Sequence, residues 1–100
     1  MIVSISKSPV KHKRFRILFR HRDGKEQNFD FGLDTGTTYI DGASAIQRDN
    51  YWKRHTTNAT EKKLIENLTA SPALFSSMIL WGKSRDIQQN IKTLNAMWKH

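Results

Sequence analysis

Two aspartate-containing triplets are the first residues in this sequence whose types and order could do chemistry. Asp34-Thr35-Gly36 has the form of the aspartic-protease triplet, in which two carboxylates share one proton. Gly32 stands where an apolar residue should lead into the aspartate, however, and such sites lie in nearly all-β folds, whereas more than half of this chain is predicted to be helical. We interpret the triplet as part of a Gly- and Thr-rich loop over residues 32–38. Asp30-Phe31-Gly32 matches the kinase magnesium triplet, but 100 residues are too few for a kinase domain.

The sequence also contains no complete motif for binding a nucleotide or a metal ion. Gly82-Lys83-Ser84 resembles the end of a phosphate-binding loop, but Ser77 replaces the glycine that the motif requires five positions earlier. The chain has no cysteine, which excludes disulfides, thiolate catalysis and cysteine-based zinc sites. The histidines lack the paired spacing of metal ligands; they are His12, His21, His55 and His100. We expect no metal, no other cofactor, no small-molecule substrate and no enzymatic activity.

One helical segment carries a constellation that belongs to neither a turn nor an obvious apolar stripe. Arg48, Tyr51, Arg54 and His55 follow one another at spacings that place them along one side of a helix. Such a side could hold a phosphate or an acidic partner, with the tyrosine ring available for stacking. The alternative is a surface ladder of Arg and Tyr side chains whose stems pack on a sheet edge.

The positive charge is concentrated at the start of the chain. The net charge is +8, from 17 Lys and Arg against 9 Asp and Glu, and residues 1–25 contribute most of it, whereas residues 26–50 are net acidic. A basic segment beside an acidic one indicates an anionic partner or internal pairing, and an exposed, solvated run of charge is an equal alternative. The basic residues left without an assigned partner are Lys7, Lys11, Lys13, Arg14, Arg22 and Lys25.

The elements that position these residues begin with a β-hairpin. Residues 14–20 and 26–31 both alternate apolar and polar side chains, as half-buried strands do. A type I turn over Arg22-Asp23, with Gly24 as the left-handed bulge residue, aligns the apolar positions of the two strands. The predicted cross-strand pairs are Ile17 with Phe29, Phe15 with Phe31, Arg16 with Asp30, and Arg20 with Glu26. Two arginines then have carboxylate partners, each pair contributing about 0.2–1 kcal/mol.

The remainder of the chain predicts helices. Expected N-caps are Asp41 for a helix to about His55, Thr60 for a second, Ser71 before Pro72 for a third that ends near Gly82, and Ser84 for the last. Trp52, Trp81 and Trp98 are predicted core residues, with an exposed partner anchor as the alternative for Trp81. Residues 2–5 fit a short strand; alternatively, residues 1–12 form a flexible basic arm. The prediction is one α+β domain over residues 1–100, an N-terminal β-hairpin or small antiparallel sheet followed by three to four packed helices.

Several blocks of the sequence are similar to one family. They are Lys7-Ser8-Pro9, Phe29-Asp30-Phe31-Gly32, Tyr39-Ile40-Asp41, the run from Arg48 to His55, and residues 68–91 around Ile79-Leu80-Trp81-Gly82-Lys83-Ser84. With these blocks the chain resembles small uncharacterised basic proteins of large nucleocytoplasmic DNA viruses, chiefly those of algae and protists. The resemblance implies a virus-encoded protein of the host cytoplasm or nucleus, which the virus particle could package. The longest apolar run, Met78 to Trp81, is far shorter than the roughly 20 residues that span a bilayer, and no signal peptide begins the chain, so a soluble intracellular protein is expected.

The functional expectation is a non-enzymatic viral structural or interaction protein, a minor capsid-associated component that binds an acidic surface of larger viral structural proteins. The alternative is a nucleic-acid-binding protein that contacts phosphates without sequence preference. The number of unpaired cations separates the two, because pairing of Arg16 and Arg20 leaves few contiguous charges for a nucleic-acid backbone. The same residues serve either function: Lys7, Lys11, Lys13, Arg14, Arg22, Lys25, Arg48, Tyr51, Arg54 and His55.

Overall fold

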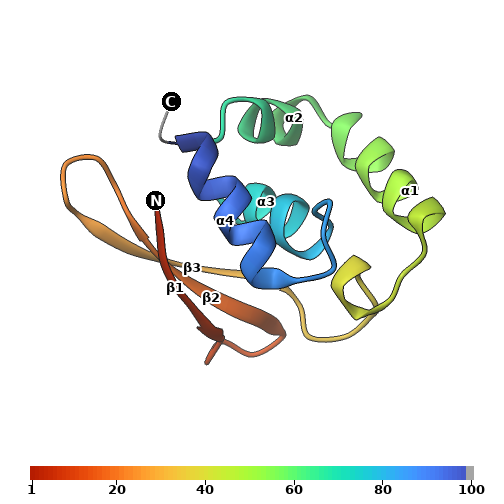
Figure 1. Cartoon of the computed structure of the whole chain (residues 1–100), viewed down its shortest axis with the longest axis horizontal. Helices are drawn as coiled ribbons and strands as arrows, with labels where there is room; N and C mark the ends of the chain where they lie inside the picture. Colours follow the sequence, from red (N-terminus) through yellow and green to blue (C-terminus); the bar gives the residue numbers. More distant parts are fainter. Residues whose placement is uncertain (99–100) are drawn as a thin grey trace.

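A three-stranded antiparallel sheet, covered on one side by helices, forms the protein (Figure 1). The structure is a computed structural model that describes residues 1–98, so His100 lies outside the described residues. The strands are β1 (Ile2–Lys7), β2 (Lys13–Arg20) and β3 (Glu26–Leu33), in the order β1-β2-β3. A short 3-10 turn, η1 (Tyr39–Asp41), precedes α1 (Ala45–Thr56), α2 (Ala59–Glu66), α3 (Pro72–Phe75), the π turn η2 (Ser76–Leu80) and α4 (Ile87–Trp98). The α+β prediction is confirmed.

The hairpin of β2 and β3 has the predicted register. Ile17 pairs with Phe29, and Arg16 pairs with Asp30. The turn also agrees with the prediction, because Gly24 has φ 89° and its amide donates to the His21 carbonyl over 3.0 Å. The period-2 alternation therefore places the phenylalanines on one face of the sheet and the charged pairs on the other.

The start of the chain is an edge strand, so a flexible basic arm over residues 1–12 is wrong. β1 pairs with β2 along its length, from Ile2 opposite Phe19 to Lys7 opposite Phe15. Its outer edge is closed at Ile2 by the side chain of Asn95. The backbone N–H of Ile2 donates to Asn95 Oδ1 (2.8 Å), and Asn95 Nδ2 donates to the carbonyl of Ile2 (3.1 Å). A side-chain amide of α4 thus takes the place of a neighbouring strand at this point of the exposed edge.

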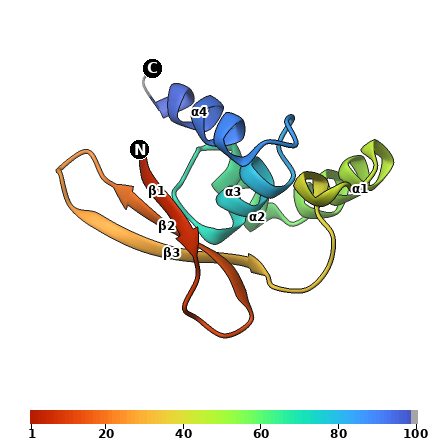
Figure 2. The ribbon, with the colours of Figure 1, turned by 60° about the horizontal axis from the view of Figure 1, so that its bottom comes forward.

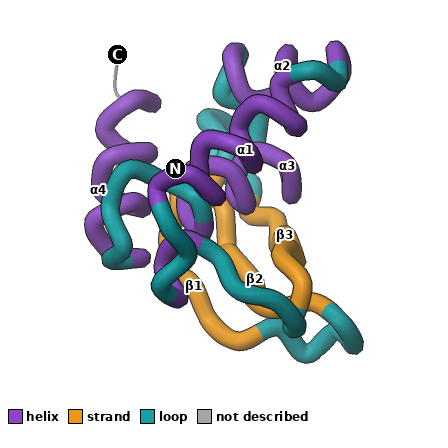
Figure 3. The backbone as a smooth tube through the Cα atoms, turned by 90° about the vertical axis from the view of Figure 1, so that its right-hand side faces the viewer, coloured by secondary structure: helices purple, strands orange, loops and turns teal. Residues whose placement is uncertain are grey.

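The core lies between the inner face of the sheet and the helices (Figures 2 and 3). Phe75 of α3 is fully buried at its centre and packs against aromatic rings of β2 and β3, with ring centroids 5.3 Å from Phe29 and 5.8 Å from Phe31. Trp98 of α4 packs edge-on against Phe19 with centroids 5.1 Å apart. Burial of such aromatic side chains supplies the main driving force for the sheet to hold the helices.

The first two helices begin at other residues than predicted. Ser44, not Asp41, caps α1: it accepts from the Gln47 amide (3.1 Å), and the Gln47 side chain accepts from the Ser44 amide (2.8 Å). Asn58, not Thr60, caps α2 and accepts from two backbone amides. Both sequence segments contain several residues that can cap a helix. In each segment the N-cap is a residue whose backbone is extended, Ser44 for α1 and Asn58 for α2.

The third helix starts as predicted but ends as a π turn. Ser71 caps it before Pro72, with its hydroxyl accepting from the Leu74 amide (3.2 Å). The last helix is capped by Asp86, which accepts from the Gln88 amide (2.8 Å), rather than by Ser84. Within residues 1–98, no helix has both the length and the apolar character needed to cross a membrane.

Candidate functional site

Three arginines of the basic segment are bound to carboxylates. Arg16 and Asp30 form two hydrogen bonds of 3.0 and 3.1 Å, and Arg20 lies 3.4 Å from Glu26, both as the predicted register requires. The pKa of the Asp30 carboxyl is lowered first by Arg16 and then by the hydroxyl of Ser8. Both arginines therefore have a carboxylate partner within the protein itself.

Arg14, expected to be available for a partner, is the third of these arginines. Its two terminal nitrogens each donate to one oxygen of Asp41 over 2.5 Å. The hydrogen bond from the guanidinium holds the pKa of the Asp41 carboxyl far below its ordinary value, and the Thr38 hydroxyl and amide add to the effect. Arg14 thus joins β2 to η1 and is removed from the candidate binding residues.

The remaining cations of the segment fall into two groups at opposite ends of the sheet. Lys7, Lys11 and Lys13 surround the β1–β2 connection, whereas Arg22 and Lys25 lie at the β2–β3 turn. β2 has 8 residues, which at about 3.3 Å per residue separates the two ends by about 23 Å. Among residues 1–98, no carboxylate lies within 4.0 Å of any of these five cationic groups. The basic segment is divided and does not form one strip.

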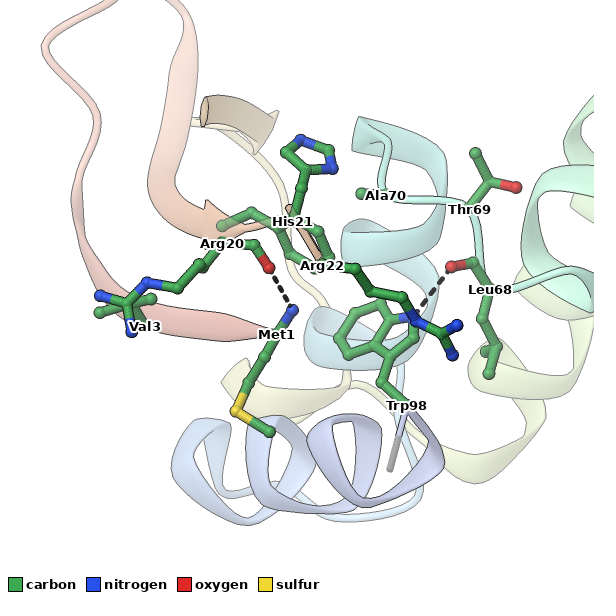
Figure 4. A pocket seen from close by; sticks show the side chains of 10 residues that line it. Met1, Val3, Arg20, His21, Arg22, Leu68, Thr69, Ala70 and Trp98 are labelled. Carbon is green, nitrogen blue, oxygen red and sulfur yellow. Dashed lines mark hydrogen bonds between the residues drawn. The ribbon is translucent and has the colours of Figure 1, made fainter. Parts of the chain in front are cut away.

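At the turn end of the sheet, Arg22 lines an apolar pocket of about 480 Å³ (Figure 4). Val3, Leu68 and Trp98 form much of its wall. The Trp98 indole donates to the Leu68 carbonyl over 3.0 Å, and the Met1 amine donates to the Arg20 carbonyl over 2.8 Å. This pocket places the Arg22 guanidinium and the Met1 amine beside an apolar surface.

The helix constellation is divided too, because Tyr51 belongs to the core. Its side chain is 8% exposed and stacks on Trp81 with ring centroids 4.6 Å apart and an interplanar angle of 9°. Its hydroxyl lies 3.4 Å from the Ser77 hydroxyl, and burial raises its pKa. Little of this ring is left open for stacking on a ligand, because α1 turns this position towards the π turn. Trp81 is half-buried within that packing, as predicted for a core residue.

Arg48 holds the end of the π turn. Its Nε donates to the carbonyls of Trp81 (3.1 Å) and Gly82 (2.9 Å). Its guanidinium also lies over the rings of Tyr39 and Trp52, at 5.7 and 5.9 Å from their centroids. Arg48 therefore points to a different neighbourhood from that of the other three residues of the constellation.

Arg54 and His55 line a cleft of about 490 Å³ that also contains Lys13 of β2. The loop between β3 and η1 forms one wall, and α1 and α2 contribute the opposite one; Figure 1 shows this loop running from the sheet to α1. His55 Nδ1 lies 2.6 Å from the Glu61 carboxylate of α2, so that this anion already has a partner. The cleft thus combines two unpaired cations with the threonine-rich 32–38 loop.

Of the ten residues predicted for the site, the structure brings Lys13, Tyr51, Arg54 and His55 to this cleft, where Tyr51 contributes as part of its wall. Lys7 and Lys11 lie at the same end of the sheet. Glu61 was not identified from the sequence as the partner of His55, and the 32–38 loop was not identified as one wall of the cleft. The density of Gly and Thr in that loop was the available signal. Within residues 1–98, no three His, Asp or Glu side chains are grouped so that they could hold a metal ion.

The cleft is suited to binding an anion. Lys13 and Arg54 provide positive charge, and loop residues Thr35 and Thr37 provide hydroxyl groups that can donate hydrogen bonds. A carboxylate or phosphate oxygen can accept from both kinds of group.

Comparison with known proteins gives one match. No curated protein and no solved structure matches the chain. A model of a family of unknown function (DUF5754) matches residues 3–55, which extend from β1 through α1 and include all ten predicted site residues. Because this match covers more than half of the sequence, the chain belongs to that family of unknown function.

Proposed function

We propose that this is a non-enzymatic interaction protein that binds an acidic segment of a larger protein in the cleft of Lys13, Arg54 and His55. In the setting that the sequence resemblance implies, the host cytoplasm or nucleus of an infected cell, the partner is a larger viral structural protein and the complex is a minor part of the virus particle. The binding chemistry of the cleft is the same in any setting.

The observation that carries the proposal is the meeting of Lys13 and Arg54 on one cleft without a carboxylate for either. These residues are far apart in the sequence, and Lys7 and Lys11 extend the positive surface around the β1–β2 connection. Cations that have no internal partner keep their attraction for an external anion, and complementary charge favours both encounter and orientation.

An acidic peptide fits this distribution better than a nucleic-acid backbone does. A phosphate track needs closely spaced cations along an extended surface. Arg14, Arg16 and Arg20 would have to supply its middle, and all three are bound to carboxylates. The unpaired cations that remain lie at the two ends of the sheet, so a compact acidic segment can use one group without the other.

The test is binding of a fluorescein-labelled oligoglutamate peptide, measured by fluorescence anisotropy at low and at physiological salt. The double variant Lys13→Gln/Arg54→Gln should weaken binding about tenfold, because it removes two charge-assisted contacts. The matched control Arg22→Gln/Lys25→Gln loses the same charge at the far end of the sheet and should bind like the unaltered protein. Equal losses in both double variants would show attraction by net charge alone and overturn the proposal.

A parallel titration with short double-stranded DNA tests the nucleic-acid alternative. If the logarithm of the binding constant falls with the logarithm of salt concentration with a slope steeper than about −4, several phosphates are neutralised together. That result, together with binding tighter than that of the peptide, would replace the acidic-peptide proposal. Weak DNA binding that disappears by physiological salt supports it.

A further inference from the structure

A second groove lies between α1 and α4 and shares no residue with the cleft. Its volume is about 460 Å³, within the range of pockets that hold small organic ligands. No residue of its lining carries a carboxylate. The lining residues are Arg48, Trp52, Met78, Gly82, Lys83, Ser84, Gln89, Asn90, Thr93 and Met97.

The walls of this groove are largely apolar. Trp52 contributes an aromatic side chain from α1, Met78 comes from the π turn, and Met97 of α4 is 40% exposed. Methionine side chains are flexible and polarisable, and they adapt to aromatic surfaces of different shape. The groove is therefore able to accommodate a flat apolar body.

The cation of the groove is already fixed in place. Arg48 is half-buried, its Nε is held by the Trp81 and Gly82 carbonyls, and its guanidinium lies over two aromatic rings. Within residues 1–98, its two terminal nitrogens make no hydrogen bond. An anion that binds there does not have to pay for ordering this side chain, and it finds donors that the fold leaves unused.

We propose that this groove is a binding site for a small organic anion with an apolar body, such as an aromatic carboxylate or sulfonate. The anionic group binds to the terminal nitrogens of Arg48, with Lys83 as a second, exposed cation at the groove. The apolar body packs on Trp52, Met78 and Met97. This site is independent of the acidic-peptide site, because the two have no lining residue in common.

The probes are two related naphthalene dyes that fluoresce when bound to apolar surfaces. 8-Anilinonaphthalene-1-sulfonate carries an anionic group, and N-phenyl-1-naphthylamine is its uncharged counterpart. The unaltered protein should bind the sulfonate at one site, at least about tenfold more tightly than the uncharged dye, because a charge-assisted hydrogen bond is gained. Equal affinity for the two dyes would overturn the proposal.

Thr93 provides the matched pair of variants that locates the site. It is exposed on α4 and lines the groove, so a substitution there leaves the core intact. Thr93→Glu introduces a carboxylate into the groove and should weaken sulfonate binding by repulsion. Thr93→Gln introduces an uncharged side chain of the same size as that glutamate, and its affinity for the sulfonate should be about tenfold higher than that of Thr93→Glu. Near-UV circular dichroism of both variants should match the unaltered protein.

Other outcomes of this experiment decide against the groove. Sulfonate binding that survives Thr93→Glu but is lost in Val3→Glu would place the dye in the pocket beside Trp98 and overturn the proposal. Loss of binding in Lys13→Gln/Arg54→Gln would place it in the cleft, with the same consequence. Unchanged sulfonate binding in Lys13→Gln/Arg54→Gln supports binding in the groove, and this result does not depend on whether the acidic peptide binds in the cleft.

Discussion

Arg14 of β2 and Asp41 of η1 face each other with two parallel hydrogen bonds of 2.5 Å, one from each terminal guanidinium nitrogen. This pair connects the sheet to the segment that leads into α1. Thr38 completes it, because its amide (3.0 Å) and hydroxyl (2.7 Å) both donate to the same carboxylate. One cation is thereby withdrawn from the surface, and the 32–38 loop that forms the cleft wall is fastened at its far end.

Removal of this carboxylate should destabilise the protein. Asp41→Asn keeps the size of the side chain but loses the charge that Arg14 and Thr38 bind, so we expect the free energy of unfolding to fall by about 1–3 kcal/mol in urea titrations. Asp34→Asn is the control, because Asp34 is exposed and its carboxylate lies 4.0 Å from Nδ1 of His12 without a lysine or arginine partner among residues 1–98. A similar loss in both variants would contradict the role given to the pair.

The pair also sets a pH dependence below neutrality. Because the pKa of Asp41 is lowered in the folded protein, its contribution to stability is fully present above its unfolded pKa of about 3.9 and is lost as the pH falls towards the folded pKa. The difference in unfolding free energy between the unaltered protein and Asp41→Asn should stay constant between about pH 5 and pH 8 and shrink below about pH 4. A difference that does not change down to pH 2 would contradict this assignment.

The register of the hairpin predicts opposite effects at two adjacent residues. Phe29 packs against Phe19 and Phe75, so Phe29→Asp buries a carboxylate without a partner and should unfold the domain. Asn28 is exposed on the opposite face, across from Leu18, and Asn28→Asp should change the unfolding free energy by less than about 0.5 kcal/mol. Circular dichroism of the two variants at 25 °C gives a direct comparison. Damage by the second substitution alone would require a register shifted by one residue.

Gly82 is predicted to tolerate no side chain. A Cβ atom there would lie 2.7 Å from Cγ of Asn90 and would also overlap the Met78 carbonyl oxygen. Gly82→Ala should therefore cost about 1–3 kcal/mol of stability, since both neighbours are held by other contacts. Gly36→Ala is the comparison: that site is open, and only its positive φ of 95° opposes a side chain, at about 1 kcal/mol. Thermal unfolding should rank Gly82→Ala as the less stable variant.

Asn95 is expected to protect the edge of the sheet. Asn95→Ala removes both hydrogen bonds to Ile2 and should reduce the unfolding free energy by about 1–2 kcal/mol. Amide hydrogen exchange at Ile2 should become faster than in the unaltered protein, because its amide then faces water. Gln88→Ala, an exposed change on the same helix, should leave that exchange rate unaltered.

The hairpin could be predicted from the sequence because its information is local. Two alternating segments, one glycine and the requirement that phenylalanines share a face left a single register, and the pairing of Arg16 with Asp30 followed from it. Helix starts were harder, since neighbouring Ser, Thr, Asn and Asp residues compete for one capping position. Asp41 is taken by Arg14, and Ser44 becomes the cap three residues later.

The candidate site was predictable only in part, because it depends on which segments meet in space. Helical periodicity placed Arg48, Tyr51, Arg54 and His55 on one side of α1, but it could not show that Trp81 covers Tyr51 and separates Arg48 from the others. The approach of Lys13 to Arg54 likewise results from the path of the 32–38 loop. No pattern within either segment carries that information.

The bond between Ile2 and Asn95 has a consequence for synthesis of the protein on the ribosome. The first strand is translated long before its partner in α4, and the aromatic rings of the hairpin likewise wait for Phe75 and Trp98. Until these residues leave the exit tunnel, the emerging sheet exposes an apolar face and an open edge, the features that invite capture by chaperones or by other nascent chains. Productive folding of this domain therefore waits until α4 has been synthesised.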